Sequence, residues 1–75
     1  IKIWPNPVYN VLNLEHSEEI KSVSVFTVSG SKKKLQINKI QGTIQCMFSE
    51  FVSGIYLLKI EFLNGNSEMF KVIKN

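Results

Sequence analysis

Few side chains in this 75-residue sequence are suited to catalysis. The chain has one histidine, His16, one cysteine, Cys46, and six glutamates, and it lacks aspartate and arginine. A Cys46–His16 dyad is the one nucleophilic arrangement that these residues offer. The alternating pattern around Cys46 turns this residue toward the interior, where a thiol usually stays inert. We therefore predict no catalytic site and no enzyme activity, with His16 as a solvated surface residue.

The remaining polar side chains form no pattern typical of acid–base chemistry or of a metal site. The adjacent Glu18 and Glu19 lie in a polar run and are expected to form a solvated turn. Zinc requires clustered cysteine and histidine ligands, and a calcium loop requires several closely spaced oxygen ligands. The sequence has neither cluster, so we predict no metal and no cofactor.

Lysine supplies all of the side-chain positive charge. Nine lysines against six glutamates give a net charge of +3. Recognition of phosphates and guanines relies mostly on arginine, so nucleic acid is not an expected ligand. Lys32, Lys33 and Lys34 form a basic run that we expect in a solvated turn. As a secondary hypothesis, this run contacts an acidic partner or anionic lipopolysaccharide.

Three aromatic residues, Trp4, Tyr9 and Tyr56, bear on sugar binding, because exposed aromatic faces can stack on sugar rings. We expect Tyr9 at the surface, and Trp4 and Tyr56 in the core or against the first corner. A carbohydrate-binding or adhesive accessory module is kept as the alternative function, and it requires at least two aromatic residues on one exposed face. A spacer domain without a ligand is a third hypothesis.

Strand patterns run along most of the chain, and no window sustains a helical apolar stripe. The predicted strands are 1–4, 11–15, 21–28, a segment around Leu35 and Ile37, 44–48, 55–63 and 67–74. In 55–63 the residues Tyr56, Leu58, Ile60 and Phe62 share one face, as in a half-buried strand. In 21–28 the step from Val25 to Phe26 indicates either that both faces are covered or that a bulge intervenes.

Proline and glycine mark the connections between these strands. The segment 5–7 must form a corner, since each proline fixes φ and lacks the N–H that a ladder needs. The Asn64-Gly65 pair predicts a two-residue type I′ hairpin turn. Further turns that favour positive φ are predicted at Gly30 and Gly54, and Gly42 marks another turn.

About seven short strands, separated by turns every 8–12 residues, are typical of an all-β, immunoglobulin-like antiparallel β-sandwich of Greek-key type. We predict a single domain over residues 1–75. The longest uncharged apolar stretch, 51–58, falls far short of the ~20 residues of a membrane-spanning helix. Because the chain opens with Ile1 and shows no signal peptide, we expect a piece of a longer polypeptide.

Four sequence elements occur in a characteristic order. An aromatic residue precedes Pro5-Asn6-Pro7, and Val23-Ser24-Val25-Phe26 is followed by the turn at Gly30. The most specific element is Ser53-Gly54-Ile55-Tyr56-Leu57-Leu58-Lys59-Ile60, and after one hairpin comes Lys71-Val72-Ile73-Lys74. Together they resemble the type A C-terminal sorting domain of the type IX (Por) secretion system of the Bacteroidota, over nearly the whole chain.

This resemblance implies an addressing function for a larger passenger protein. The parent protein would reach the periplasm, and the outer-membrane translocation machinery would recognise the domain and export the passenger to the cell surface or the medium. A sortase-like peptidase would then remove the domain by a cut upstream of Ile1 or near it. The implied sorting residues are those of the four motifs: Pro5, Asn6, Pro7, Gly30, Ser53, Gly54, Tyr56, Lys71, Val72, Ile73 and Lys74.

We further expect a monomer that carries its recognition signal on a folded surface and on the last strand. The segment Lys71–Asn75 is predicted to contribute much of the recognition. An edge strand at a terminus has unpaired N–H and C=O groups, to which a partner can add a strand.

Overall fold

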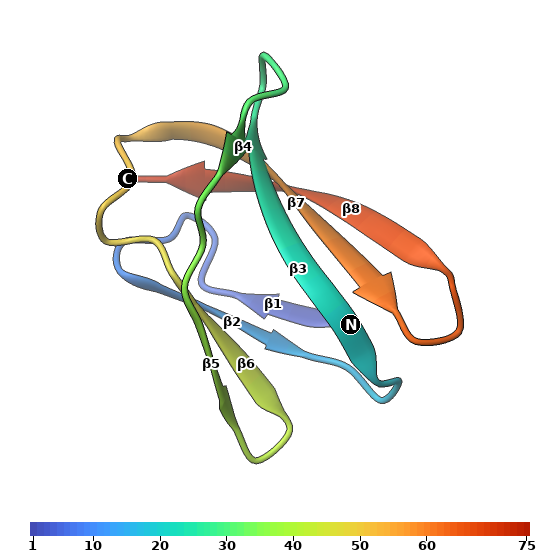
Figure 1. The fold of residues 1–75 in the computed structure, drawn as a ribbon. Helices are drawn as coiled ribbons and strands as arrows, with labels where there is room; N and C mark the ends of the chain where they lie inside the picture. The colour runs from blue at the N-terminus through green and yellow to red at the C-terminus, as the bar shows by residue number, and fades with distance from the viewer.

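Eight β-strands and no helix make up the fold, which a computed structural model describes for residues 1–75 (Figure 1). The strands are β1 (Lys2–Trp4), β2 (Val11–Glu15), β3 (Ile20–Thr27), β4 (Lys32–Lys33), β5 (Ile37–Ile40), β6 (Thr43–Met47), β7 (Gly54–Phe62) and β8 (Ser67–Lys74). The predicted all-β class is confirmed. No helix with the length and apolar character needed to span a bilayer is found.

The strands form two four-stranded sheets. Sheet A has the order β1-β2-β6-β5 and sheet B the order β4-β3-β7-β8, and all pairs of strands within them are antiparallel. The chain crosses between the sheets after β2, after β4 and after β6 (Figure 1). The predicted antiparallel sandwich is therefore confirmed.

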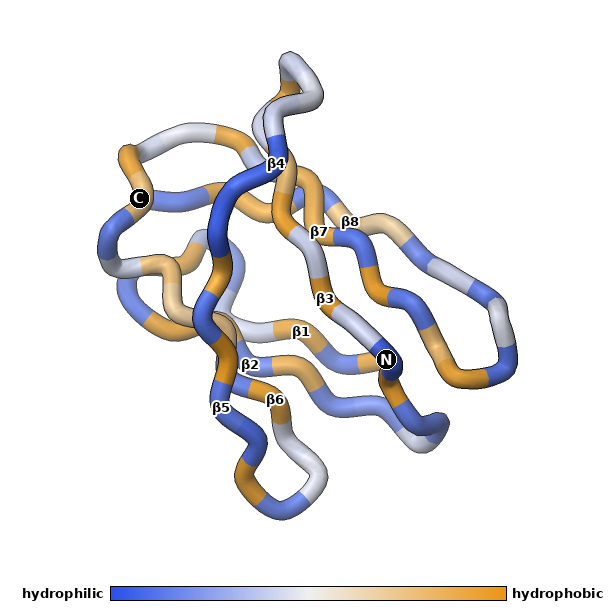
Figure 2. The backbone as a smooth tube through the Cα atoms, in the orientation of Figure 1, coloured by the Kyte–Doolittle hydropathy of each residue, from blue (hydrophilic) through white to orange (hydrophobic).

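The core lies between the sheets and contains 12 buried residues, none of them polar or charged. Figure 2 shows hydrophobic and hydrophilic residues alternating along the strands, the pattern that gives each strand one inward face. The core residues are Val8, Leu12, Leu14, Val25, Ile44, Cys46, Phe48, Tyr56, Leu58, Ile60, Phe62 and Val72. Each fully buried large apolar side chain contributes about 1.5–3 kcal/mol, so a domain this small depends on every one of them.

The prediction of a single strand around Leu35 and Ile37 is wrong. Two short strands occupy this region: β4 pairs with β3 in sheet B, and β5 pairs with β6 in sheet A. The intervening residues 34–36 carry the chain from one sheet to the other. Since this segment must change sheets, the apolar alternation through Leu35 cannot belong to one continuous strand, and the count rises from about seven strands to eight.

The irregularity expected in β3 lies at the start of the strand. The register with β7 shifts between Ile20 and Ser22, whereas Val25 and Phe26 pair in regular register with Leu58 and Leu57. Val25 therefore faces the core and Phe26 faces outward, where its side chain is half-buried within its own sheet. The outer face of sheet B thus carries apolar side chains without a covering layer.

The type I′ turn occurs at a different hairpin from the one predicted. Gln41 and Gly42 both have positive φ, 40° and 84°, and connect the paired Ile40 and Thr43. At the β7–β8 hairpin only Gly65 has positive φ, 91°, and its N–H donates to the carbonyl of Phe62 at 3.0 Å. The central residues of that hairpin are therefore Leu63 and Asn64. Its loop is longer than two residues, and Gly65 closes it in a left-handed conformation.

Candidate functional site

The two residues of the hypothetical nucleophilic dyad lie in different environments. Cys46 is fully buried on β6 opposite Leu12, and burial raises the pKa of its thiol from 9.0 to about 12. His16 follows the end of β2, four residues beyond Leu12, which is about 13 Å along a strand. A protonated thiol at that separation from the imidazole has no base to activate it.

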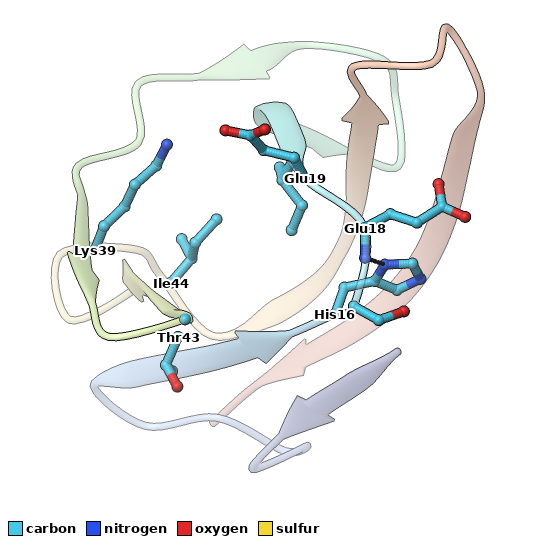
Figure 3. Close-up of a pocket in the computed structure, with 9 residues that line it drawn as sticks. His16, Glu18, Glu19, Lys39, Thr43 and Ile44 are labelled. Carbon is cyan, nitrogen blue, oxygen red and sulfur yellow. Dashed lines mark hydrogen bonds between the residues drawn. The ribbon is translucent and has the colours of Figure 1, made fainter.

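His16 has structural contacts in the turn between β2 and β3. Its Nδ1 accepts a hydrogen bond from the backbone N–H of Glu18 at 2.9 Å, and its ring lies 4.6 Å from the ring of Phe62, centroid to centroid. Figure 3 shows this bond at the side of a shallow depression of about 340 Å³. The imidazole therefore caps the end of the core, which differs from the free surface position predicted for it.

The neighbouring carboxylates do not form an acid–base pair. The side chains of Glu18 and Glu19 point in opposite directions (Figure 3), and Glu18 Oε2 accepts a hydrogen bond from Asn64 Nδ2 at 2.8 Å. No group of three or more histidine, cysteine or glutamate side chains that could hold a metal ion is present. The depression next to His16 thus has the features of a hydrogen-bonded turn.

The residues of the four sorting motifs gather at one end of sheet B. Tyr56, at the start of β7, pairs with Thr27 near the end of β3 and with Val72 near the end of β8. Gly54 pairs with Lys74, and Gly30 lies in the hairpin that follows β3. Because Thr27 is the last residue of β3 and Val72 lies near the end of β8, this hairpin leaves sheet B at the end where β8 finishes. Motifs that are far apart in the sequence therefore form one region, which we call the motif end.

Asn6 connects the first motif to the last. Its Nδ2 donates to the carbonyl of Lys71 at 3.1 Å, and its Oδ1 accepts from the N–H of Ile73 at 2.9 Å. The carboxamide thus bonds to the outer edge of β8 as a neighbouring strand would. The Trp4–Pro5 and Asn6–Pro7 peptide bonds are both cis. We call this pair of hydrogen bonds the asparagine clasp.

Val8 extends the contact along the same edge. Its N–H donates to the carbonyl of Ile73 at 2.7 Å, and its carbonyl accepts from the N–H of Asn75 at 2.9 Å. Its side chain is completely buried. Val8 could not be selected from the sequence, because one apolar residue in a polar bend has no periodicity to mark it.

The edge of β8 is therefore not open where we expected it to be. The outward carbonyl of Lys71, both outward groups of Ile73 and the N–H of Asn75 are already bonded to Asn6 and Val8. The expectation of unpaired backbone groups at Lys71–Asn75 is wrong for these four groups. A corner of the same chain covers that part of the edge, as edge strands commonly require.

Two of the sorting residues are internal. Val72 is fully buried, and Tyr56 is 3% exposed and donates from its hydroxyl to the carbonyl of Val52 at 2.6 Å. The Tyr56 ring stacks on Phe51 at 5.3 Å and meets Phe48 edge-on at 6.0 Å. A tyrosine at the start of a strand that bonds back to the preceding backbone resembles the tyrosine corner of immunoglobulin-like sandwiches. Both residues position the motif end from within.

The other sorting residues lie at the surface or in turns. Gly30 and Gly54 have φ of 95° and 153°, as predicted, and a Cβ at either position would meet no atom within 4 Å. The side chains of Lys71 and Ile73 share the outer face of β8, and Lys74 Nζ donates to the carbonyl of Asn75 at 2.6 Å. The surface available to a partner at this end therefore consists of Lys71, Ile73 and their neighbours on β7.

The aromatic residues do not form the pair that sugar binding would require from Trp4 and Tyr56. Tyr56 points into the core, as predicted, and Tyr9 is exposed, as predicted. Trp4, however, is 41% exposed on the outer face of β1, so of the two positions predicted for it, core or corner, the core position is wrong. Its carbonyl accepts a hydrogen bond from Asn13 Nδ2 at 3.2 Å, which fixes the backbone of the first corner.

Comparison with known proteins identifies a family. The family model described as "Secretion system C-terminal sorting domain" matches residues 2–75. Neither the curated proteins nor the solved structures include a match to the chain. Since the family model spans essentially the entire sequence, and since the motifs that carry the resemblance are brought together at one end of the sandwich, the chain belongs to the C-terminal sorting domain family of the type IX secretion system.

Proposed function

We propose that this chain is the single sorting domain, residues 1–75, of a larger secreted protein, and that it directs its passenger across the outer membrane. The family is one of sorting signals, not one of known enzymes, and membership supports a role in export. In this proposal the passenger crosses the periplasm and finishes at the cell surface or in the medium. The outer-membrane translocation machinery of the type IX system is the direct partner of the domain.

The observation that carries the proposal is the gathering of the motifs at the motif end. A linear signal would need only a contiguous segment, whereas here Asn6 holds the backbone of Lys71 and Ile73 from 65 and 67 residues away. The buried pair Tyr56 and Val72 supports the same surface from the core. The signal is therefore a folded surface in which the first corner orders the last strand.

Removal of the domain after translocation is part of the same proposal. Ile1 is 43% exposed, and β1 is the edge strand of sheet A. A sortase-like peptidase can reach a segment in such a position more readily than one within a sheet. We expect the cut upstream of Ile1 or near it, and we expect the domain to act as a monomer.

The first experiment fuses the domain to the C-terminus of a secreted reporter in a bacterium with a type IX system. The fusion is expected in the medium or at the cell surface, and the reporter alone is expected in the periplasm. Retention of the intact fusion in the periplasm would contradict the proposed function.

Deletion of residues 71–75 is expected to abolish export, but it removes the buried Val72 and the clasp together. A sharper variant is Lys71→Ala combined with Lys74→Ala, which keeps Val72 and the backbone of β8. The matched control is Lys2→Ala with Lys39→Ala on sheet A, which removes the same charge. Full export of the Lys71/Lys74 variant, with no export of the deletion, would show that these lysines are not recognised.

A further inference from the structure

The outer face of sheet B carries a row of four side chains across its four strands. Lys32 on β4 pairs with Phe26 on β3, Phe26 pairs with Leu57 on β7, and Leu57 pairs with Lys71 on β8. Residues in register across a sheet project from the same face. This face therefore presents two half-buried apolar side chains with a lysine at each end, and we call it the Lys-Phe-Leu-Lys row.

Further apolar side chains border this row on both sides. Ile55 and Ile73 pair with each other one step toward the motif end and are 46% and 38% exposed. Met69 lies one step the other way, opposite Lys59, and is 55% exposed. Sheet A covers only the inner face of sheet B, so these residues form an apolar patch that the chain leaves in contact with solvent.

The charges on this face have one sign near the patch. Lys32, Lys71 and Lys59 lie in or beside the row. The outward positions of β3, β7 and β8 include one acidic residue, Glu61, which lies two rows away from Leu57. A partner that covers the apolar centre must therefore place its own side chains next to lysines. Complementarity favours carboxylates at those positions.

We infer that the outer face of sheet B, from Lys32 on β4 to Lys71 on β8, is a docking surface for an acidic protein segment. The segment would carry apolar side chains onto Phe26, Leu57 and Ile73 and carboxylates to Lys32 and Lys71. The two lysines stand three strand spacings apart, about 14 Å, which sets the separation of the acidic groups. This inference rests on the proposed function, because the partner would belong to the export machinery.

Two other occupants fit the face less well. A second copy of the domain in a two-fold dimer would bring the same patch onto itself, and lysines would then meet lysines. An anionic lipid headgroup would contact the lysines but would leave Phe26 and Leu57 uncovered between them. A segment with both apolar and acidic side chains satisfies both features of the row.

The test uses the reporter fusion with Lys32→Glu and Lys71→Glu together. Both side chains are exposed, so the fold is expected to survive, and far-ultraviolet circular dichroism of the purified fusion checks it. Export is expected to fall about tenfold or more, since each reversal replaces an attraction by a repulsion. The matched control is Lys2→Glu with Lys39→Glu, which changes the net charge equally on sheet A, and Lys32→Arg with Lys71→Arg keeps the charge.

The outcomes separate this inference from the proposed function. If the unmodified fusion is not exported, the proposed function fails. If it is exported and the Lys32/Lys71 reversal is exported equally well, or if the sheet A control loses export to the same degree, the docking surface is wrong. Met69→Ser with Ile73→Ser probes the apolar part, and undiminished export of that folded variant would also overturn the inference.

Two measurements on the purified fusion test the competing occupants. Sedimentation at rising concentration is expected to show a monomer, and a dimer that the reversal dissociates would assign the face to a second copy. Vesicles of phosphatidylglycerol and phosphatidylcholine are expected to bind the fusion and its reversal variant equally weakly. Strong vesicle binding that the reversal abolishes would assign the face to anionic lipid.

Discussion

Asn6→Ala should weaken the domain by removing the asparagine clasp. The substitution deletes both hydrogen bonds from the carboxamide, 3.1 Å to the carbonyl of Lys71 and 2.9 Å from the N–H of Ile73. A typical hydrogen bond contributes about 0.5–1.5 kcal/mol net. Because this site is exposed and water can reach the freed groups, we expect a total loss of about 1–2 kcal/mol.

That loss is a sizeable part of the stability of so small a domain. Seventy-five residues correspond to an unfolding free energy of about 4–11 kcal/mol. A change of about 1–2 kcal/mol should lower the melting temperature by roughly 5–15 °C in a domain of this length. Thermal unfolding followed by circular dichroism measures the shift. Asn10→Ala is the matched control, since Asn10 lies in the same bend region and its side chain makes no hydrogen bond.

Amide hydrogen exchange locates the effect. The Ile73 amide should exchange about 5- to 30-fold faster in Asn6→Ala, which is the ratio that corresponds to about 1–2 kcal/mol. The Val72 amide faces β7 by the alternation of the ladder and serves as an internal reference. If Asn6→Ala melts within a degree of the unmodified domain and the Ile73 amide keeps its protection, the clasp does not order the last strand.

Three further predictions concern the core and the turns. Burial raises the pKa of the Cys46 thiol from 9.0 to about 12, so its contribution to stability is present below pH 9 and is lost toward pH 12. Urea titrations should show this alkaline loss relative to Cys46→Ala, and an identical pH dependence of the two proteins would contradict it. Tyr56→Phe removes the bond to Val52 and should cost about 0.5–1.5 kcal/mol without changing the fold; a chemical-denaturation midpoint equal to that of the parent would exclude a role for the hydroxyl. Gly54→Val should cost about 1 kcal/mol or more, because φ is 153° there while a Cβ meets no neighbour, and an unchanged melting temperature would show that the backbone tolerates a side chain.

The inward faces of the strands could be predicted from the sequence. Along β7 every second residue from Tyr56 to Phe62 is buried, and the alternation of apolar residues already indicates this. The same holds for Leu12 and Leu14 on β2. A period of two with one covered face fixes which residues point inward, and no information about distant segments is needed.

The features that depend on distant segments could not be predicted. Asn6 is one of several exposed asparagines until the corner is placed beside β8. The step from Val25 to Phe26 suggested either a covered face or a bulge, and only the arrangement of the sheets shows that the outer side is bare. The turn types also depend on loop length, which explains why Gln41-Gly42 and not Asn64-Gly65 forms the type I′ turn.

The contact between Asn6 and β8 also constrains the order in which the molecule can fold. Residues 5–8 are translated before residues 71–75, and neither the corner nor the edge of β8 has its hydrogen-bonding partner until both exist. Local hairpins such as β7–β8 can form early, but closing this long-range contact must wait for nearly the entire sequence. A polypeptide interrupted before residue 71 would lack the assembled motif end. Such an incomplete product would therefore not present the folded surface that we propose as the sorting signal.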